Sequence, residues 1–359
     1  MRFNWLNVLW MKFLPIFRIV ATSCVLFLSA GCEQSQEKQI LRTARSLIER
    51  NQLDRAYNQL DELCRYDPSA FEARQLQIVI LLKRGQTEKA IDMYANLRAQ
   101  SAPVTFLNET IHDLDPAVRA GICLLIARTK PSNAVYLLSK ASSDSNRDVR
   151  RAAVQGMARY EGKKVRQALE NALVDPTWQV RADAAGALEK LGDPAAAQSL
   201  LQTMLDVDGY VRLKARRALV SLIDDSNLSV YRRALKHGNP HVRTAAALAL
   251  AQRQDDDALG ALYEGLRAKD SSLRVATARA LAALGDRSAR PLLRQSLSDP
   301  DAQVRATAAL SLAELGDVVS TNNLAILAGS DPVESVRMAA AQAFQLLSPS
   351  ATTVELMPH

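Results

Sequence analysis

Apolar residues recur with the period of a helix in successive segments between about residues 104 and 347. In one segment Ala184, Ala185, Leu188 and Leu191 lie three, four, seven and ten residues after Arg181. This spacing places an apolar stripe along one face of a helix, and the alanines allow neighbouring helices to approach closely. A second apolar segment follows each first one, without the alternation typical of a strand. We therefore predict pairs of helices.

Turn signals separate the predicted helices. Glycine suits the left-handed residue that ends a helix, and aspartate can cap the helix that follows. Such pairs occur at Gly192–Asp193, Gly285–Asp286 and Gly316–Asp317. A turn rich in Asp, Asn and Pro then closes the unit, at Asp175–Pro176, Asn239–Pro240, Asp299–Pro300 and Asp331–Pro332. Each unit is therefore predicted to be helix, turn, helix.

An aliphatic residue followed by arginine marks each first helix at a fixed period. The interval between successive arginines is the same six times and is longer by one at the last step. The eight arginines are Arg119, Arg150, Arg181, Arg212, Arg243, Arg274, Arg305 and Arg337. A fixed period of this size indicates a stacked array of one supersecondary unit, and such arrays usually form binding surfaces. The predicted fold is all-α, an α-solenoid of about eight such units.

The repeated arginine needs a physical reason, because a helix macrodipole disfavours a cation near the helix start by up to roughly 1 kcal/mol. The nearest compensating groups are turn acids six residues earlier, Asp144, Asp175, Asp206, Asp299 and Asp331, with Asp115 and Asp270 four residues earlier. We predict a structural ladder in which each arginine bridges to its own or an adjacent turn. The alternative is a row of phosphate-binding arginines, which the neighbouring acids would neutralise.

The pattern D-P-x-x-Q-V-R-x-x-A-A-x-A-L-x-x-L-G-D, clearest at Asp175–Asp193 and Asp299–Asp317, resembles the HEAT-like repeats first named from phycobilin lyases. The resemblance covers about residues 104–347 and implies a helical solenoid. Its relatives include scaffolds, adaptors, lyase subunits and, with added histidines, an iron-dependent hydroxylase. The resemblance therefore implies the fold firmly and leaves the function open.

Residues 38–103 carry a different and slightly longer period. The matching positions are Asn51 and Gly85, Ala56 and Ala90, Leu60 and Tyr94, Leu63 and Leu97, and Pro68 and Ala102. This pattern resembles the tetratricopeptide repeat, which implies two helical hairpins. Two repeats are too few to be comfortably stable alone, so we expect them to stack on the first HEAT-like unit in one continuous right-handed superhelical rod.

The N-terminus resembles the signal of a bacterial lipoprotein. Residues 1–31 contain three bases and no acid, and an apolar run from Ile19 to Gly31 ends at Cys32. The run is too short for a stable membrane span. Leu28–Cys32 resembles a lipobox, which implies a signal peptide over 1–31, a diacylglycerol on Cys32 and a tether over 32–37. The alternative is an ordinary cleaved signal that contains a cysteine.

This resemblance implies a location in the bacterial cell envelope, with the chain lipid-anchored and facing the periplasm. Glu33 at the second mature position favours the outer membrane in a cell with two membranes. Met11 is an alternative start, because Met11–Cys32 forms a complete signal by itself. Residues 348–359 show little helical pattern, and we expect them to form a flexible tail.

Composition argues against nucleic-acid binding and against catalysis. Without residues 1–31 the formal charge falls from +7 to +4, which is spread over a long array, whereas nucleic-acid binding favours a concentrated basic stripe. The histidines are His112, His237, His241 and His359, with no His-Glu dipeptide and no Cys-x-x-Cys pair. We therefore predict a protein that is not an enzyme, with no catalytic residue, cofactor, metal or small-molecule substrate.

Two pairs of residues invite a more specific interpretation that we do not adopt. His237 and His241 are separated by Gly238–Pro240, which breaks any helix between them, so we do not expect a shared metal. Cys64 and Cys123 lie in helical patterns of different repeats, so we expect two small buried apolar residues and no disulfide.

The scarce aromatic residues of the array suggest where a partner binds. Trp178, Tyr210 and His241 lie two or three residues before successive arginines, so they fall on consecutive turns along one edge. Exposed Trp and Tyr are favoured at binding hot spots. In the alternative, Trp178 covers a helix end and Tyr210 is merely amphipathic. Another candidate is the concave face, which we expect the second helices to build, with Arg216, Arg217 and Arg279 as exposed contacts.

These patterns predict a non-enzymatic, lipid-anchored envelope scaffold or adaptor that binds a protein partner through its helical-repeat surface. One specific version is an assembly factor for an envelope complex. The alternative from another class is an enzyme subunit resembling the HEAT-repeat bilin lyases, which would act on phycobiliproteins in the cytoplasm, so a signal at 1–32 counts against it. A module that binds peptide or peptidoglycan is a third interpretation.

Overall fold

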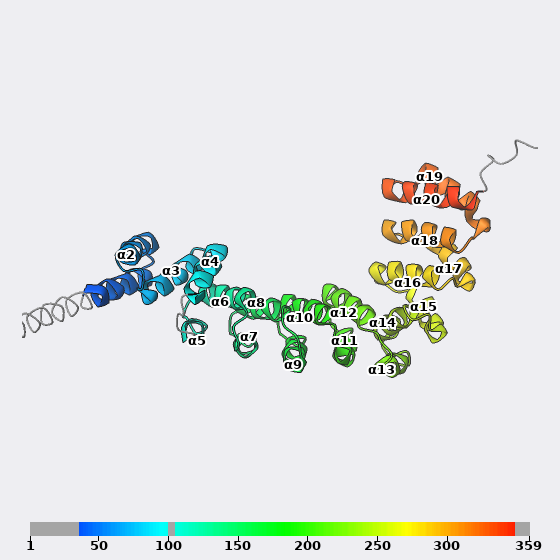
Figure 1. Cartoon of the computed structure of the whole chain (residues 1–359). Coiled ribbons are helices and arrows are strands. Elements are labelled where there is room, and N and C mark those ends of the chain that lie inside the picture. Colours follow the sequence, from blue (N-terminus) through cyan, green and yellow to red (C-terminus); the bar gives the residue numbers. More distant parts are fainter. Residues whose placement is uncertain (1–35, 100–104, 349–359) are drawn as a thin grey trace, which may run out of the picture. The chain divides into compact units, whose positions relative to one another are not determined.

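The computed structural model describes residues 36–99 and 105–348 of the chain (Figure 1). Within these ranges the regular elements are helices and no strand is present. The prediction of an all-α, solenoid-like fold is confirmed. The chain divides into two compact units, residues 1–137 and residues 138–359.

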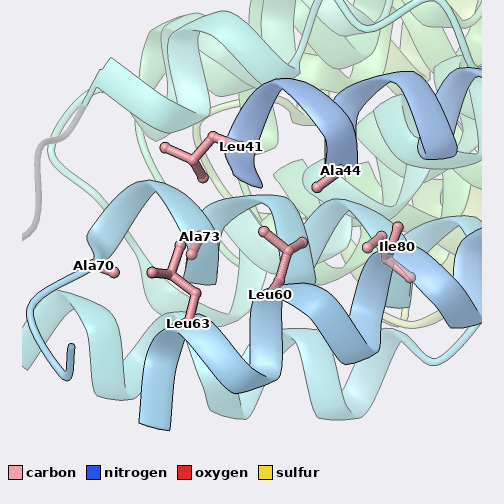
Figure 2. Packing of buried hydrophobic residues seen from close by; sticks show 8 residues of the cluster. Leu41, Ala44, Leu60, Leu63, Ala70, Ala73 and Ile80 are labelled. Atoms are coloured by element: carbon pink, nitrogen blue, oxygen red, sulfur yellow. The ribbon is translucent and has the colours of Figure 1, made fainter. Parts of the chain in front are cut away.

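The first unit begins with a helix over residues 36–49. It continues with α2 (Leu53–Tyr66), α3 (Phe71–Lys83), α4 (Thr87–Ala99), α5 (Thr105–Thr110) and α6 (Pro116–Thr129). Figure 2 shows part of its core, where Leu60 and Leu63 of α2 lie among Leu41, Ala73 and Ile80 of the neighbouring helices. The helix pairs are held together by this apolar contact, because a single amphipathic helix cannot bury its own stripe.

The sequence period of the first unit has a structural counterpart. Asn51 and Gly85 end their helices with φ values of 58° and 71°, the left-handed conformation that small residues tolerate best. Ala56 and Ala90, the next matching pair, are both fully buried. Matching positions therefore have the same backbone conformation or the same burial in two successive helical hairpins.

The second hairpin packs directly on the first helix of the arginine-marked array. Both α3 and α4 contact α6. A Cβ atom at Gly121 of α6 would lie 2.6 Å from Leu82 Cδ2, so any side chain there would displace the Leu82 side chain of α3. Lys83 Nζ also lies 2.7 Å from Asp115 Oδ2. The first compact unit therefore continues past residue 103, where the repeat pattern changes.

The second unit consists of paired helices, and α7 (Ala134–Ala141) spans the division before it. The first helices of its repeats are α8 (Arg147–Met157), α10 (Trp178–Leu191), α12 (Gly209–Ser221), α14 (Pro240–Ala251), α16 (Ser271–Ala283), α18 (Ala302–Glu314) and α20 (Glu334–Leu347). The second helices are α9 (Lys163–Ala172), α11 (Ala197–Thr203), α13 (Leu228–Ala234), α15 (Leu259–Gly265), α17 (Arg290–Ser296) and α19 (Thr321–Ser330). The successive first helices pack against one another, as the neighbouring labels α16, α18 and α20 show in Figure 1.

Single-turn 3-10 helices precede four of the second helices. They are η1 (Pro194–Ala196), η2 (Asp256–Ala258), η3 (Arg287–Ala289) and η4 (Val318–Ser320). The predicted glycine ends are present, because Gly192, Gly285 and Gly316 have φ values between 67° and 71°. Asp193 and Asp286 each accept the N–H of the residue two positions later, as capping residues do.

Asp317 departs from the predicted capping role. Its side chain is buried and makes no cap; instead it accepts two hydrogen bonds of 2.7 Å from Arg294, from Nε to Oδ2 and from Nη2 to Oδ1. Ser320 also donates to its carboxylate. The Gly-Asp signal therefore located the turn correctly but did not distinguish a capping aspartate from one that pairs with a neighbouring helix.

The apolar stripe of the first helices forms the core of the array. Val180, Ala184, Ala185 and Leu188 of α10 are fully buried, whereas Leu191 at the helix end is half-buried. Burying a leucine or valine side chain contributes about 1.5–3 kcal/mol. None of the helices in residues 36–99 and 105–348 combines the length and apolarity needed to cross a membrane.

Candidate interaction surface on the turn edge

A repeated arginine binds the turn aspartate of the next repeat in at least four places. Each guanidinium donates through Nε and Nη2 to the two oxygens of one carboxylate, in the pairs Arg150–Asp175, Arg181–Asp206, Arg274–Asp299 and Arg305–Asp331. The donor–acceptor distances lie between 2.6 and 3.0 Å. The groups are mostly buried, with side-chain exposures of 12% for Arg305 and 3% for Asp331. We call these four pairs the ladder.

Each ladder arginine also binds its own turn. Nη1 of Arg181 donates to the carbonyl oxygens of Asp175 at 2.8 Å and Pro176 at 3.3 Å, and Arg305 binds its turn in the same way. The Oδ1 atom of Asp175 accepts the N–H of Thr177 at 2.8 Å, which shapes the turn. An arginine therefore joins two turns, because it binds carbonyls of its own turn and a carboxylate of the next.

The acids four residues before an arginine do not belong to the ladder. Asp115 accepts the N–H of Ala117 at 2.9 Å and Asp270 accepts that of Ser272 at 2.9 Å. Both are N-caps, of α6 and α16. Their position at a helix start explains the difference, because a short carboxylate there reaches the free backbone N–H groups first.

The ladder lowers the pKa of three of its carboxylates, Asp175, Asp206 and Asp331. Hydrogen bonds from Arg305 keep the pKa of Asp331 below its ordinary value. For Asp206, burial acts to raise the pKa, but hydrogen bonds from Arg181 and from the backbone of Asp208 outweigh it and the net shift is downward. Carboxylates occupy the Nε and Nη2 edge of the four ladder arginines, so these arginines do not form the alternative phosphate-binding row.

The ladder is interrupted at Arg212 and Arg243. In the repeat after Arg212, His237 occupies the position that a ladder aspartate would hold. In the repeat after Arg243, Ala268 occupies that position. Arg243 pairs instead with Glu264, from Nε at 3.0 Å and Nη2 at 2.8 Å, and that glutamate side chain is 54% exposed. The array therefore compensates one interruption with a solvent-exposed carboxylate.

Arg212 has no replacement carboxylate among the residues that the structure describes. Its Nη1 donates to the carbonyl oxygens of Asp206 at 2.8 Å and Val207 at 3.1 Å, as in the ladder. Its Nε is buried without a hydrogen-bond partner. The turn after it keeps the ladder geometry, because His237 Nδ1 accepts the N–H of Asn239 at 3.0 Å and the His237 carbonyl accepts from Arg243 at 2.8 Å. Only the carboxylate is missing.

Two of the predicted partner-binding residues touch each other beside this gap. The rings of Trp178 on α10 and Tyr210 on α12 lie edge to face, with centroids 5.9 Å apart and an interplanar angle of 82°. They are 41% and 49% exposed. Lys214 Nζ lies 5.5 Å from the Tyr210 ring centroid. Trp178 therefore contacts the next repeat and presents part of its ring to solvent.

The third predicted residue, His241, lies in a different environment. It is half-buried at the start of α14, and its backbone N–H donates to Asn239 Oδ1 at 2.8 Å. Burial lowers the pKa of the His241 imidazole; the nearby Arg212 and Arg216 act in the same direction and Asp270 opposes them. His241 is therefore a neighbour of the unpaired guanidinium, favoured in its neutral form.

The three arginines expected as exposed contacts do not lie on second helices; Arg217 and Arg279 are exposed as expected, whereas Arg216 is buried. Arg216, Arg217 and Arg279 lie on α12 and α16, which are first helices. Arg216 is only 7% exposed, and its Nη2 lies 3.4 Å from the carbonyl oxygen and from Oγ of Ser272. Arg217 is exposed but lies 3.4 Å from Glu189 Oε1. Arg216 is buried because α12 and the start of α16 approach each other.

The remaining predicted residues are the cysteines and the candidate metal ligands. In the part of the chain that the structure describes, no three His, Cys, Asp or Glu side chains gather closely enough to hold a metal ion. Cys64 and Cys123 are not joined in a disulfide. Cys123 is buried as expected, but Cys64 is half-buried, and burial raises the pKa of its thiol. Cys32, the lipobox and His359 lie outside the described residues.

The sequence indicated that Trp178 and Tyr210 lie on one edge, but the gap at Arg212 was not predicted. In the sequence, the position 25 residues after the arginine holds Asp175, Asp206 or Asp299 in three ladder pairs. The same position holds His237 after Arg212 and Ala268 after Arg243. That signal was present in the sequence. Its meaning depends on knowing that the carboxylate comes from the next turn, which the stacking of the repeats decides.

Comparison with known proteins identifies the repeat class. A family model described as HEAT repeats matches residues 102–189, 136–220, 204–274 and 261–345. No curated protein matches the chain. The prediction of HEAT-like repeats is confirmed, whereas the tetratricopeptide-like and lipoprotein assignments stay predictions.

Solved structures with similar folds come from several proteins. A chain in the structure of Kap95p with RanGDP matches with a TM-score of 0.52 and 13% identity, over 82% of this chain and 47% of that one. YibA of E. coli matches with a TM-score of 0.44 and 19% identity, over 69% of this chain and 94% of that one. The complex of CpcE and CpcF of phycocyanin lyase from Nostoc sp. matches with a TM-score of 0.35 and 21% identity, over 68% and 94%. At these identities the similarity concerns the fold alone.

Proposed function

This protein belongs to the HEAT-repeat family, and from that premise we propose that it is a non-enzymatic scaffold that holds a protein partner in the bacterial cell envelope. A helical-repeat array of this kind is suited to protein interaction. Its surface is ordered before the partner arrives, which lowers the entropic cost of association.

The observation that carries the proposal is the exposed aromatic pair of Trp178 and Tyr210. Two large aromatic rings in contact on adjacent first helices leave much of their surface in solvent. Val207, in the turn before α12, is 93% exposed. Grouped exposed apolar side chains of this kind are typical of an interaction surface, and Trp and Tyr are the residues most often found at its centre.

The ladder supports this placement because it holds the turn edge in register. Arg181 joins its own turn to that of Asp206, so the turns that precede α10 and α12 are tied to each other. Trp178 and Tyr210 are the first and second residues of the helices that follow these two turns. A partner therefore meets aromatic side chains whose backbone positions are already defined.

The anchor part of the proposal is supported by the sequence of residues 1–32. A basic start, an apolar run and the Leu-Ser-Ala-Gly-Cys segment ending at Cys32 together favour lipidation and a location facing the periplasm, at the outer membrane where a cell has two. A Cys32→Ser change is expected to move the protein from the membrane to the soluble fraction. Continued membrane retention of that variant would contradict the anchor.

The partner is sought by crosslinking and affinity capture from membranes. Wild type is compared with the double variant Trp178→Ala/Tyr210→Ala and with Tyr136→Ala, which removes another exposed tyrosine, on α7. We expect a defined envelope protein in the wild-type and Tyr136→Ala samples and its loss from the double variant. A partner retained by the double variant would move the site off this edge. Recovery of a pigment or a phycobiliprotein would instead favour a lyase subunit.

A further inference from the structure

We infer that the gap in the ladder at Arg212 receives a carboxylate from the partner, so that the turn edge recognises an acidic peptide segment with an apolar side chain beside the acid. The inference rests on the proposed scaffold function and adds the chemistry of the partner. It uses residues of the second compact unit only.

The repeats themselves show which ligand chemistry fits this position. In the four ladder pairs the same edge of the same arginine binds one carboxylate in a bidentate arrangement. Arg212 is held in the same way by the carbonyl oxygens of Asp206 and Val207. Its guanidinium is therefore oriented before any ligand arrives, and the planar fork matches a carboxylate in geometry.

The gap leaves an unsatisfied donor and a way towards the guanidinium. Nε of Arg212 is buried without an acceptor, which is costly for a charged group. Gly209 is exposed and lies beside the other donor of the fork, since a Cβ atom there would be 3.5 Å from Arg212 Nη2. Because glycine carries no side chain, a carboxylate of the partner can approach Nη2 of Arg212 from this direction and then also accept the hydrogen bond that Nε offers.

The charges around the gap favour an acidic ligand. Lys214 lies beside the Tyr210 ring, and Arg216 lies near Arg212. The described acids of this region already have partners: Asp206 binds Arg181, Asp208 caps α12 and Asp270 caps α16. Among the described residues, no direct contact with a carboxylate therefore compensates the positive charge at Arg212.

A carboxylate fits better than a phosphate. Asp206 and Asp208 stand in the turn before Arg212 and would repel a dianion more strongly than a single carboxylate. The aromatic pair and Val207 lie at the same turns, so an apolar side chain next to the acid would find contact area. Together these features select an acidic peptide with a neighbouring aromatic or aliphatic residue.

The test uses the purified full-length chain and a fluorescein-labelled peptide of alternating glutamate and phenylalanine, followed by fluorescence anisotropy. The matched peptide has glutamine in place of glutamate. We expect the glutamate peptide to bind at least tenfold more tightly. His237→Asp supplies the missing carboxylate within the chain, so it should weaken peptide binding at least tenfold while raising the melting temperature.

Ala268→Asp is the control variant. It adds the same charge one repeat later, where Arg243 already pairs with Glu264, and should leave peptide binding within twofold of wild type. Arg212→Gln should abolish the preference for glutamate over glutamine. The melting temperatures of all variants are measured alongside, so that loss of folding is not mistaken for loss of binding.

Four results would overturn the inference: no binding of the glutamate peptide, binding insensitive to His237→Asp, an equal loss in Ala268→Asp, or displacement by inorganic phosphate at an equal concentration of anion. The proposed scaffold function is tested separately by capture from membranes. Loss of the partner from Trp178→Ala/Tyr210→Ala with full retention by His237→Asp would support the scaffold function and contradict the carboxylate site at Arg212. A partner retained by both the aromatic double variant and His237→Asp would show that the partner does not bind at this turn edge.

Discussion

Arg305 and Arg212 bind their own turns in the same way and differ in what the next turn offers them. In both, Nη1 of the arginine binds two carbonyl oxygens of its own turn. Asp331 then completes the fork of Arg305, whereas His237 stands at the corresponding place after Arg212 and offers no carboxylate. The comparison teaches that the residue in the next turn decides whether the Nε and Nη2 edge of the arginine is paired within the chain, and the unpaired edge at Arg212 is where we propose that a ligand binds.

The interruption at Arg243 lies between these two cases. Its partner Glu264 comes from within α15 and is largely exposed, so solvent screens the pair. Exposed pairs typically contribute only about 0–1 kcal/mol, whereas removing one partner of a buried pair costs about 3–5 kcal/mol. Burial of the carboxylate, more than the number of hydrogen bonds, therefore distinguishes the ladder from its substitutes.

Acid weakens three ladder pairs together, those of Asp175, Asp206 and Asp331, and has the largest expected effect. The folded-state pKa values of Asp175, Asp206 and Asp331 are lowered, so the unfolded chain binds more protons in the pH range between the folded and unfolded values. The stability they contribute is present above the unfolded pKa of about 3.9 and is lost as pH falls through the folded values. Urea unfolding at pH 7 and at successively lower pH should show this loss. A stability that does not change below pH 4 would contradict it.

Neutralising a single ladder carboxylate should have the second largest effect. Asp299→Asn keeps an oxygen that can accept the N–H of Asp301 but removes the charge that Arg274 binds. We expect a loss of about 3 kcal/mol, because a mostly buried guanidinium is left with a neutral partner. Urea unfolding followed by two probes measures it, since repeat arrays can unfold in parts. Hydrogen exchange should increase at α16 and α18, and a loss below about 1 kcal/mol would mean that the pair contributes little.

Restoring the missing carboxylate should act in the opposite direction and more weakly. His237→Asp places an acid after Arg212 in a turn whose hydrogen bonds already match the ladder. We expect a gain of about 1.5 kcal/mol from the new charge-assisted hydrogen bonds. Thermal unfolding compared with Ala268→Asp measures it. An unchanged or lower stability would show that this turn does not place residue 237 as the ladder turns place their aspartates.

The smallest effect is expected at the exposed substitute pair. Glu264→Ala removes the partner of Arg243 and should cost about 0.5 kcal/mol, with a dependence on salt. Urea unfolding at low and high salt, with Asp299→Asn as reference, checks this. A loss as large as that of Asp299→Asn would remove the distinction between buried and exposed pairs.

Particular residues show where prediction from the sequence ended. The helix ends at Gly192, Gly285 and Gly316 were predictable, because the left-handed conformation is a local property of glycine. The roles of Asp317 as a buried partner of Arg294 and of Arg216 as a buried side chain were not. These depend on which groups of neighbouring helices come within reach, and the sequence pattern of a single repeat does not contain that information.

By itself the sequence determined the helical units, their period and the turns between them, because these follow from interactions over a few residues: apolar spacing, caps and glycine ends. The tertiary structure alone decided that each ladder arginine takes its carboxylate from the next turn and that Trp178 meets Tyr210. Both contacts join residues that lie most of a repeat or more apart in the chain. Their existence depends on the distance at which one repeat stacks on another, and only the packed array sets that distance.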